Sequence, residues 1–196
     1  SAWGVVYGSI LMLFTILYML TILLMEKKDK EIYKGLSDTD ALTGLFNRRA
    51  FQAAVDETLL KRISGVFIFI DVDNFKDYND KYGHANGDLC LKHFAAAMKK
   101  CFPKDSILGR YGGDEFVVYI KNAASDDAHR YMDEFQREIS HLIMAGGEHV
   151  TVSASAGGVA FIGEGEDFVS LCRSADNMLY DVKRNGKGTF KMKGAK

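Results

Sequence analysis

Three carboxylates lie where turns are expected, and they are the first candidates for chemistry. Asp71 follows the nearly all-apolar run at residues 65–70, while Asp114 and Glu115 follow two glycines between two further apolar runs. Carboxylates held close together repel one another, and a divalent cation relieves that repulsion. Ligand sets made only of oxygen favour Mg²⁺ or Mn²⁺ over Zn²⁺, and Mg²⁺ often completes its shell with substrate phosphates.

Three lysines are candidates to meet such phosphates. Lys76 lies in the segment after Asp71, and Lys183 and Lys187 lie in the last expected helix and the loop after it. Lysines and carboxylates at one end of a sheet indicate nucleotidyl or phosphoryl transfer. Taken singly, each residue has a simpler structural explanation, because Asp and Gly-Gly-Asp-Glu are ordinary features of strand ends and turns. The combination is what favours chemistry.

The apolar pattern predicts the elements that would bring these side chains together. We expect a helix capped by Asn47, strands at 65–70, 107–111, 116–120, 150–161 and 189–192, and helices at 75–81, 88–100, 125–144 and 167–184. The order is that of a ferredoxin-like split βαβ domain with additions, an α+β fold whose central sheet contains antiparallel strands and is flanked by helices. In that plan the second hairpin strand pairs with the first strand, which brings Asp71 close to Asp114 and Glu115.

The composition excludes several classes of protein. The chain has 196 residues, of which 47% are hydrophobic and 26% charged, so it can form a core and is not disordered. A net charge of −1 argues against nucleic acid as a partner. Three widely spaced cysteines exclude a disulfide framework and a CxxC metal site, and they predict buried thiols in a reducing compartment.

The first 25 residues carry no charged side chain, and residues 5–25 are apolar on every side. As a helix this run would span roughly 30 Å, so it predicts a transmembrane helix, and the lysines that follow predict that its end is cytoplasmic. A signal peptide is disfavoured because no basic segment precedes the run. A buried core helix stays possible, and a dimerising helix is compatible with a span. Because the chain does not begin with Met, we expect a longer region upstream.

Five segments together resemble the GGDEF family of diguanylate cyclases, in family order and spacing over residues 36–192. They are Arg110–Phe116 (RYGGDEF), Asp40–Phe51, Asp71–Asp88, Thr151–Gly157 and Ala175–Lys183. The apolar run, the charged segment after it and this resemblance together give three expected regions: a transmembrane helix at 1–25, a helical linker at 26–37 and a GGDEF domain at 38–192.

The resemblance implies a metal-dependent enzyme that joins two GTP molecules into cyclic di-GMP and releases two pyrophosphates. It assigns Mg²⁺ or Mn²⁺ to Asp71, Asp114 and the carbonyl of Val72, with Glu115 at a second ion. Asp114 would also take the proton of the 3′-hydroxyl. Because each domain holds one GTP, the active form would be a homodimer, joined through the GGDEF domain and the N-terminal helix.

The resemblance also assigns the contacts to GTP. Asn79 and Asp88 would read the guanine edge, which suits an amide and a carboxylate, and His84 would lie in the substrate loop. Three lysines would contact phosphates: Lys76 the transferring one, and Lys183 and Lys187 the β- and γ-phosphates. Many relatives have Arg at the last position, so a two-pronged contact there is not expected.

Two features bear on regulation and on competing functions. The family's Arg-x-x-Asp product-binding motif is absent, since Pro103 and Ser106 stand at its positions, so we expect no inhibitory site. A catalytically silent GGDEF domain that binds GTP or another protein is the main alternative, and synthesis of a mixed GMP–AMP product is disfavoured by Asp88. We expect the domain on the cytoplasmic side of the cell inner membrane, attached through residues 5–25.

Overall fold

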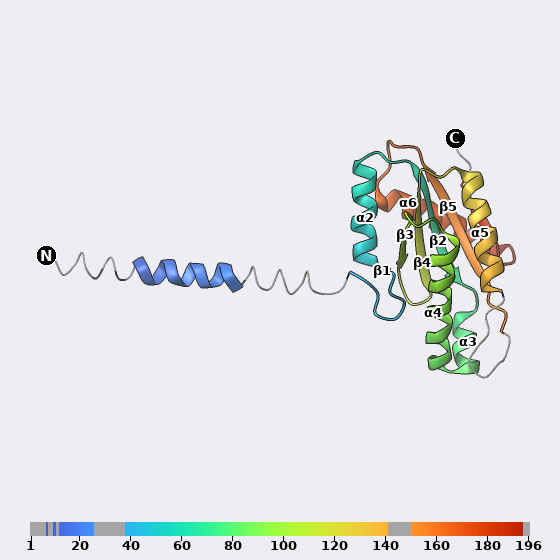
Figure 1. The fold of residues 1–196 in the computed structure, drawn as a ribbon, viewed down its shortest axis with the longest axis horizontal. Coiled ribbons are helices and arrows are strands. Elements are labelled where there is room, and N and C mark those ends of the chain that lie inside the picture. Colours follow the sequence, from blue (N-terminus) through green and yellow to red (C-terminus); the bar gives the residue numbers. More distant parts are fainter. Residues whose placement is uncertain (1–6, 8–9, 11, 26–37, 141–149, 194–196) are drawn as a thin grey trace. The chain divides into compact units, whose positions relative to one another are not determined.

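The computed structural model describes residues 7, 10, 12–25, 38–140 and 150–193 (Figure 1). The chain divides into two units, Ser1–Asp38 and Thr39–Lys196. In the first unit, residues 12–25 are helical and their side chains are exposed. Among the described residues, no helix is both long and apolar enough to cross a membrane. The transmembrane helix expected at 5–25 is therefore not supported, and part of it, with most of the linker expected at 26–37, lies outside the described residues.

The described part of the second unit contains a six-stranded mixed sheet in the order β1-β3-β4-β2-β5-β6. Its strands are β1 (Phe46–Asn47), β2 (Gly65–Val72), β3 (Ile107–Arg110), β4 (Glu115–Lys121), β5 (Ala154–Phe161) and β6 (Phe190–Met192). The pairs β1–β3 and β5–β6 are parallel, and the other neighbours are antiparallel. The α+β fold with an antiparallel-containing sheet flanked by helices is thus confirmed.

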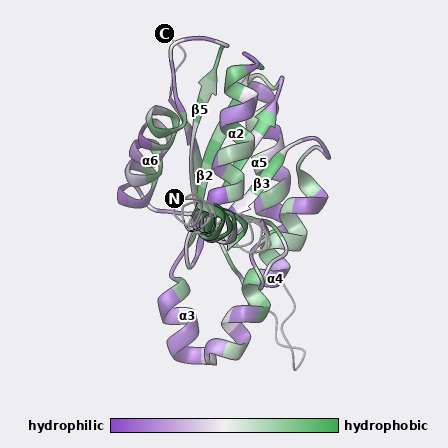
Figure 2. Ribbon diagram, turned by 90° about the vertical axis from the view of Figure 1, so that its left-hand side faces the viewer, coloured by the Kyte–Doolittle hydropathy of each residue, from purple (hydrophilic) through white to green (hydrophobic). Residues whose placement is uncertain are grey.

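Helices cover both faces of this sheet (Figure 1). They are α2 (Arg48–Leu60), α3 (Phe75–Tyr82), α4 (His84–Cys101), α5 (Ser125–Ile139) and α6 (Phe168–Arg184). The side chains of α2 and α6 pack in one core, and those of α4 and α5 pack in the other. Helix α3 is hydrophilic along most of its length (Figure 2), and none of its residues is buried.

The central strand β2 is buried along its whole length and separates the two cores. Ile68 and Ile70 lie in the core of α4 and α5, whereas Phe67 and Phe69 lie in the core of α2 and α6. Side chains alternate along a strand, so Asp71 falls on the same side as Phe69. This alternation directs the carboxylate toward α6.

Three expected elements have a boundary that differs by more than two residues, and one strand was not expected. The helix expected at 88–100 begins at His84, because Gly83, with φ of 83°, ends α3 and starts α4 at once. The strand expected at 150–161 begins only at Ala154, since its partner β2 ends at Val72. Strand β1 was not expected, because two residues are too short to show a pattern. The helix expected at 125–144 ends at Ile139, and residues 141–149 lie outside the described part.

Candidate active site

The three carboxylates meet where β2 lies beside the β3–β4 turn. Asp71 is the register partner of Glu115 in the β2–β4 ladder. One residue further on, the backbone N–H of Val72 donates to the carbonyl oxygen of Asp114 over 3.1 Å. The hairpin turn is therefore fixed to the end of β2, as the strand order predicts. Asp71 is buried, while Asp114 and Glu115 are partly exposed.

A lysine from the last helix completes this end of the sheet. The Nζ of Lys183 on α6 lies 2.8 Å from Oδ2 of Asp71. Helix α6 can approach because Gly157 on β5 has no side chain, and a Cβ there would collide with the helix backbone at Ala175 and Leu179. The absence of one methyl group on β5 thus allows α6 to bring its ammonium group to the carboxylates.

The electrostatic balance of the cluster still favours added positive charge. Burial raises the pKa of Asp71; the Lys183 ammonium opposes this, and the charges of Asp114 and Asp73 raise the pKa further. Burial likewise raises the pKa of Glu115, followed by the charges of Asp71 and Asp114. Both carboxyl groups are therefore harder to ionise in the fold than in water, and a cation beside them would reverse that effect.

The donor set fits a hard divalent ion, although the side chains are not arranged around one. Within the described residues, no three or more His, Cys, Asp or Glu side chains form a ready metal-binding group. One oxygen of Asp71 is instead paired with Lys183. The nearby side chains of Asp114 and Glu115 are also carboxylates, and the single Lys183 ammonium offsets their mutual repulsion only in part. Oxygen donors of this kind select Mg²⁺ or Mn²⁺.

The other two lysines lie around the loop that connects β2 to α3. The Nζ of Lys187 lies 2.8 Å from Oδ1 of Asn74, the residue immediately before α3. Lys76 is exposed in the first turn of α3. The structure therefore brings Lys183 to the carboxylates and Lys187 to the β2–α3 loop, and it places Lys76 on the surface beside that loop.

The residues expected to contact guanine lie on the hairpin of α3 and α4. The amide of Asn79 on α3 packs against Gly87 of α4 so closely that a Cβ at Gly87 would overlap Oδ1 of Asn79. That oxygen is buried and has no hydrogen-bond partner. Asp88 and His84 are exposed on α4, one turn apart and hence on one face. A buried acceptor without a donor beside a free carboxylate is suited to the donor edge of a base.

Arg110 and Asp40 had no expected function, yet together they hold the Gly-Gly turn. The guanidinium of Arg110 donates through Nε and Nη2 to the carbonyl of Gly113, at 3.1 and 2.7 Å. Its Nη1 lies 3.1 Å from Oδ1 of Asp40, which also accepts from the N–H and hydroxyl of Thr43. Both residues belong to motifs quoted above, and this was the available signal.

Asp73 was also missed. It is 9% exposed, and its carboxylate accepts hydrogen bonds from three groups on other segments. These are the hydroxyls of Ser153 and Ser155, at 2.7 and 2.6 Å, and the N–H of Gly188 at 3.0 Å. The only signal in the sequence was its position two residues after Asp71, since residues two apart in an extended segment lie on the same side of the backbone.

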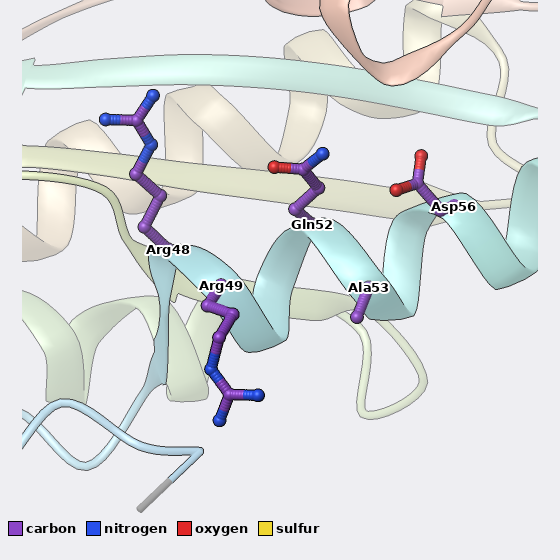
Figure 3. Close-up of a pocket in the computed structure, with 5 residues that line it drawn as sticks. All are labelled: Arg48, Arg49, Gln52, Ala53 and Asp56. Atoms are coloured by element: carbon purple, nitrogen blue, oxygen red, sulfur yellow. The ribbon is translucent and has the colours of Figure 1, made fainter. Parts of the chain in front are cut away.

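A separate hollow of about 510 Å³ lies on the outer surface of α2 (Figure 3). It is lined by Arg48, Arg49, Gln52, Ala53 and Asp56. The guanidinium of Arg48 lies 4.3 Å from the centre of the Tyr111 ring, next to the Gly-Gly turn. None of the residues expected to bind metal or nucleotide lines this hollow, so it is distinct from the carboxylate cluster.

Comparison with known proteins gives a consistent result. The family model described as "Diguanylate cyclase, GGDEF domain" matches residues 37–189. The chain is 33% identical, over 84% of its length, to the cyclic di-GMP phosphodiesterase PdeR of Escherichia coli. It is 34% identical, over 81% of its length, to a diguanylate cyclase of Vibrio cholerae. These matches cover 25% and 50% of the two relatives, so the chain spans half or less of their length.

A solved structure shows the same fold. The GGDEF domain of DgcB from Caulobacter crescentus, in complex with cyclic di-GMP, superposes with a TM-score of 0.73 at 27% sequence identity. The superposition covers 80% of this chain and 95% of that domain.

Proposed function

This chain belongs to the GGDEF diguanylate cyclase domain family, and on that premise we propose that it condenses two GTP molecules into cyclic di-GMP with release of two pyrophosphates. The observation that carries the proposal is the meeting of Asp71, Asp114 and Glu115 at the end of β2, with Lys183 at 2.8 Å from Asp71. Such a group of acidic oxygens and one ammonium suits phosphoryl chemistry on a polyanionic substrate.

In the proposed mechanism, Mg²⁺ or Mn²⁺ would be held by Asp71, Asp114 and the Val72 carbonyl, with Glu115 at a second ion. A bound divalent ion supplies neutralisation of the charge on the reacting phosphate. Asp114 accepts the proton of the attacking 3′-hydroxyl. Asp114 can be placed for this because the Arg110 guanidinium and the Val72 N–H fix the two sides of its turn.

The remaining side chains bind and orient GTP. The Asp88 carboxylate accepts from the N–H groups of the guanine edge, and the Asn79 amide both accepts from and donates to that edge. His84 lies one turn from Asp88 on the same helix face. Three lysines contact the phosphates: Lys76 the transferring group, and Lys183 and Lys187 the β- and γ-phosphates. With nucleotide and metal bound, Lys183 would leave the Asp71 carboxylate and contact a phosphate, because Asp71 would then hold the metal instead.

Each domain holds one GTP, so the reaction requires two copies to meet as a homodimer. We propose that the segment before residue 38 holds the two domains near each other, which raises their effective concentration. Attachment to the inner membrane, with this domain in the cytoplasm, is a further part of the proposal. It rests on the sequence of residues 5–25 and the lysines after it, and cell fractionation with and without residues 1–25 tests it.

A catalytically silent GGDEF module is the second candidate. The similarity to PdeR, a protein named as a phosphodiesterase, favours it, because a GGDEF domain can accompany another activity. The intact set of Asp71, Asn79, Asp88, Asp114 and Glu115 favours turnover instead.

Product analysis separates the two candidates. The purified chain is incubated with GTP and Mg²⁺, and the nucleotides are separated by chromatography. We expect cyclic di-GMP and pyrophosphate, and we expect Asp114→Asn to keep the fold by circular dichroism while losing at least nine tenths of the rate. Asp105→Asn, at an exposed position between α4 and β3, is the matched control and should keep full activity. GTP binding without product would favour the silent module.

A further inference from the structure

Asp73 joins three segments that are far apart in the sequence. It follows β2 directly, its hydroxyl donors Ser153 and Ser155 lie at the start of β5, and its third donor, Gly188, lies in the loop after α6. The N–H of Gly188 also contacts the Ser155 hydroxyl oxygen at 3.2 Å. Both carboxylate oxygens are therefore occupied by donors, which distinguishes Asp73 from the neighbouring Asp71.

The loop that Asp73 holds has an unfavourable backbone. Gly186, Lys187 and Gly188 follow one another with φ of 120°, 61° and 65°. For a lysine this left-handed conformation is disfavoured, and it persists only where the surroundings impose it. The surroundings here are the hydrogen bond from the Lys187 N–H to the Val182 carbonyl, at 3.2 Å, and the hydrogen bond from Gly188 to Asp73.

The same arrangement sets the direction of the Lys187 side chain. Its Nζ lies 2.8 Å from Oδ1 of Asn74, which is the residue after Asp73 and is itself left-handed, with φ of 55°. Asp73 is thus adjacent in sequence to Asn74, which accepts from the Lys187 ammonium. It is also hydrogen-bonded to Gly188, which is adjacent in sequence to Lys187. The ammonium group is held over the β2–α3 loop by contacts at both ends of the lysine residue.

We propose that Asp73 is a positioning residue, which fixes the strained loop at Gly186–Gly188 so that Lys187 meets the terminal phosphates of the nucleotide. The inference rests on the proposed function, because it takes GTP as the ligand of this site. Removing the Asp73 carboxylate lets the loop relax to commoner backbone angles and moves Lys187 away. The loss falls on the terminal phosphates and leaves the contacts of the base unchanged.

The test compares two nucleotides that differ in the phosphates Lys187 would contact. One is a GTP analogue with a methylene group between the α- and β-phosphorus atoms, which cannot release pyrophosphate, and the other is GMP. Binding of each to the full chain with Mg²⁺ is measured by calorimetry. We expect Asp73→Asn to weaken binding of the analogue about tenfold, the effect expected when hydrogen bonds to a charged group are lost. Binding of GMP should change less than twofold.

Three further variants make the test specific. Lys187→Ala should show the same selective loss, and the double variant should be no weaker than Lys187→Ala alone, because both changes remove one interaction. Ser155→Ala removes one donor to Asp73 and should give a smaller loss of the same kind. Asp77→Asn, an equal charge change at an exposed position on α3, should leave both affinities unchanged.

Several results of these measurements would overturn the positioning role of Asp73 or the proposed function. The positioning role would be overturned if Asp73→Asn weakened binding of GMP and of the analogue equally. It would also be overturned if the effects of Asp73→Asn and Lys187→Ala on the affinity for the analogue were additive. If Asp73→Asn does not fold, an unchanged affinity of Ser155→Ala for the analogue would overturn it as well. A wild-type chain that binds neither nucleotide would overturn the proposed function itself, and this inference with it. A wild-type chain that binds the analogue while Asp73→Asn binds it equally well would overturn the inference alone.

Discussion

The ammonium nitrogen of Lys183 lies 2.8 Å from a carboxylate oxygen of Asp71, in the place where a metal-binding carboxylate would be expected to face a cation. The pair joins the end of α6 to the end of β2. Because the Lys183 side chain is 38% exposed and that of Asp71 only 12%, the lysine can turn toward solvent while the aspartate stays fixed. Lys183 therefore balances part of the charge of this cluster, and in the proposed function it would do so before metal and nucleotide bind.

The carboxylate cluster should cost stability when no metal is present. The pKa of Glu115 is raised by burial, then by the charges of Asp71 and Asp114. When a carboxyl group has a higher pKa in the folded state than in the unfolded state, the fold loses stability as the pH rises from the unfolded-state pKa to the folded-state pKa. The penalty is therefore present at neutral pH. We expect Glu115→Gln to raise the unfolding temperature at pH 7 in the presence of a chelator. We expect Mg²⁺ to raise the unfolding temperature of the wild type more than that of Glu115→Gln.

Thermal unfolding followed by circular dichroism, with and without Mg²⁺, measures both effects. Glu134→Gln on the exposed side of α5 is the control, because it removes the same charge away from the cluster. A lower unfolding temperature for Glu115→Gln in chelator would show that the carboxylate is stabilising, contrary to the argument.

Base recognition can be tested at a residue that would not itself touch the base. A Cβ at Gly87 would overlap the Asn79 amide, so Gly87→Ala should displace that amide although alanine is the better helix former. We expect roughly tenfold weaker binding of GTP, and a similar loss for Asp88→Ala, since a hydrogen bond to a charged group contributes about 1.5–3 kcal/mol. Discrimination between GTP and ATP should fall in both variants.

Calorimetry with GTP and ATP analogues gives these affinities. Ala85→Gly, at an exposed position two residues before Gly87 in α4, controls for a change in helix stability. Unaltered discrimination in Asp88→Ala would mean that this carboxylate does not read the base.

The ladder that joins Asp71 to Glu115 was predictable, whereas the contacts of Asp73 were not. A short apolar run indicates a buried strand and the two glycines indicate a hairpin, so the meeting of the carboxylates followed from the order of the strands. The bond from Gly188 to Asp73 spans 115 residues and depends on three loops and strand ends being in place together. No local pattern encodes such a contact.

The same distinction explains the guanine side of the site. The pairing of Asn79 with Gly87 depends on how two short helices cross, and the sequence showed only that a helix stopped at Gly83. The roles proposed for Asn79, His84 and Asp88 came from resemblance to a family, and physical reasoning from the residues alone did not reach them.

The contact between Asp40 and Arg110 should make stability sensitive to acid. Partial burial opposes ionisation of Asp40, but hydrogen bonds from Thr43 and the Arg110 guanidinium outweigh it and lower its pKa below 3.8. A carboxylate whose pKa is lowered in the fold stabilises the folded state at pH values above its unfolded-state pKa. That stabilisation is lost as the pH falls through the folded-state pKa. We expect Asp40→Asn to cost about 1–2 kcal/mol at pH 7, allowing for partial exposure.

Urea unfolding at several pH values measures this difference. The gap between wild type and Asp40→Asn should narrow as the pH falls below about 4, where the wild-type carboxylate takes up a proton. Asp105→Asn, at an exposed position between α4 and β3, controls for the charge. A gap that is constant with pH would show that the ion pair is not its source.

Cyclic di-GMP should inhibit this chain only by competing with GTP. The positions where an Arg-x-x-Asp site would stand are Pro103 and Ser106, in the turn between α4 and β3 that is closed by a hydrogen bond from the Ser106 N–H to the Pro103 carbonyl. Neither side chain is charged. The adjacent Lys104 is exposed, but a single ammonium does not reproduce the two parallel bonds of a guanidinium.

Initial rates at several GTP concentrations, with and without cyclic di-GMP, test this expectation. In the wild type we expect KM for GTP to rise and kcat to stay constant. Replacing both positions, as Pro103→Arg with Ser106→Asp, supplies the fork and the carboxylate on the turn, and it should add a component that lowers kcat. Noncompetitive inhibition of the wild type would mean that other residues of this chain bind the product. Because the double replacement lies away from the carboxylate cluster, its activity without cyclic di-GMP should match the wild type, which separates new regulation from damage to the site.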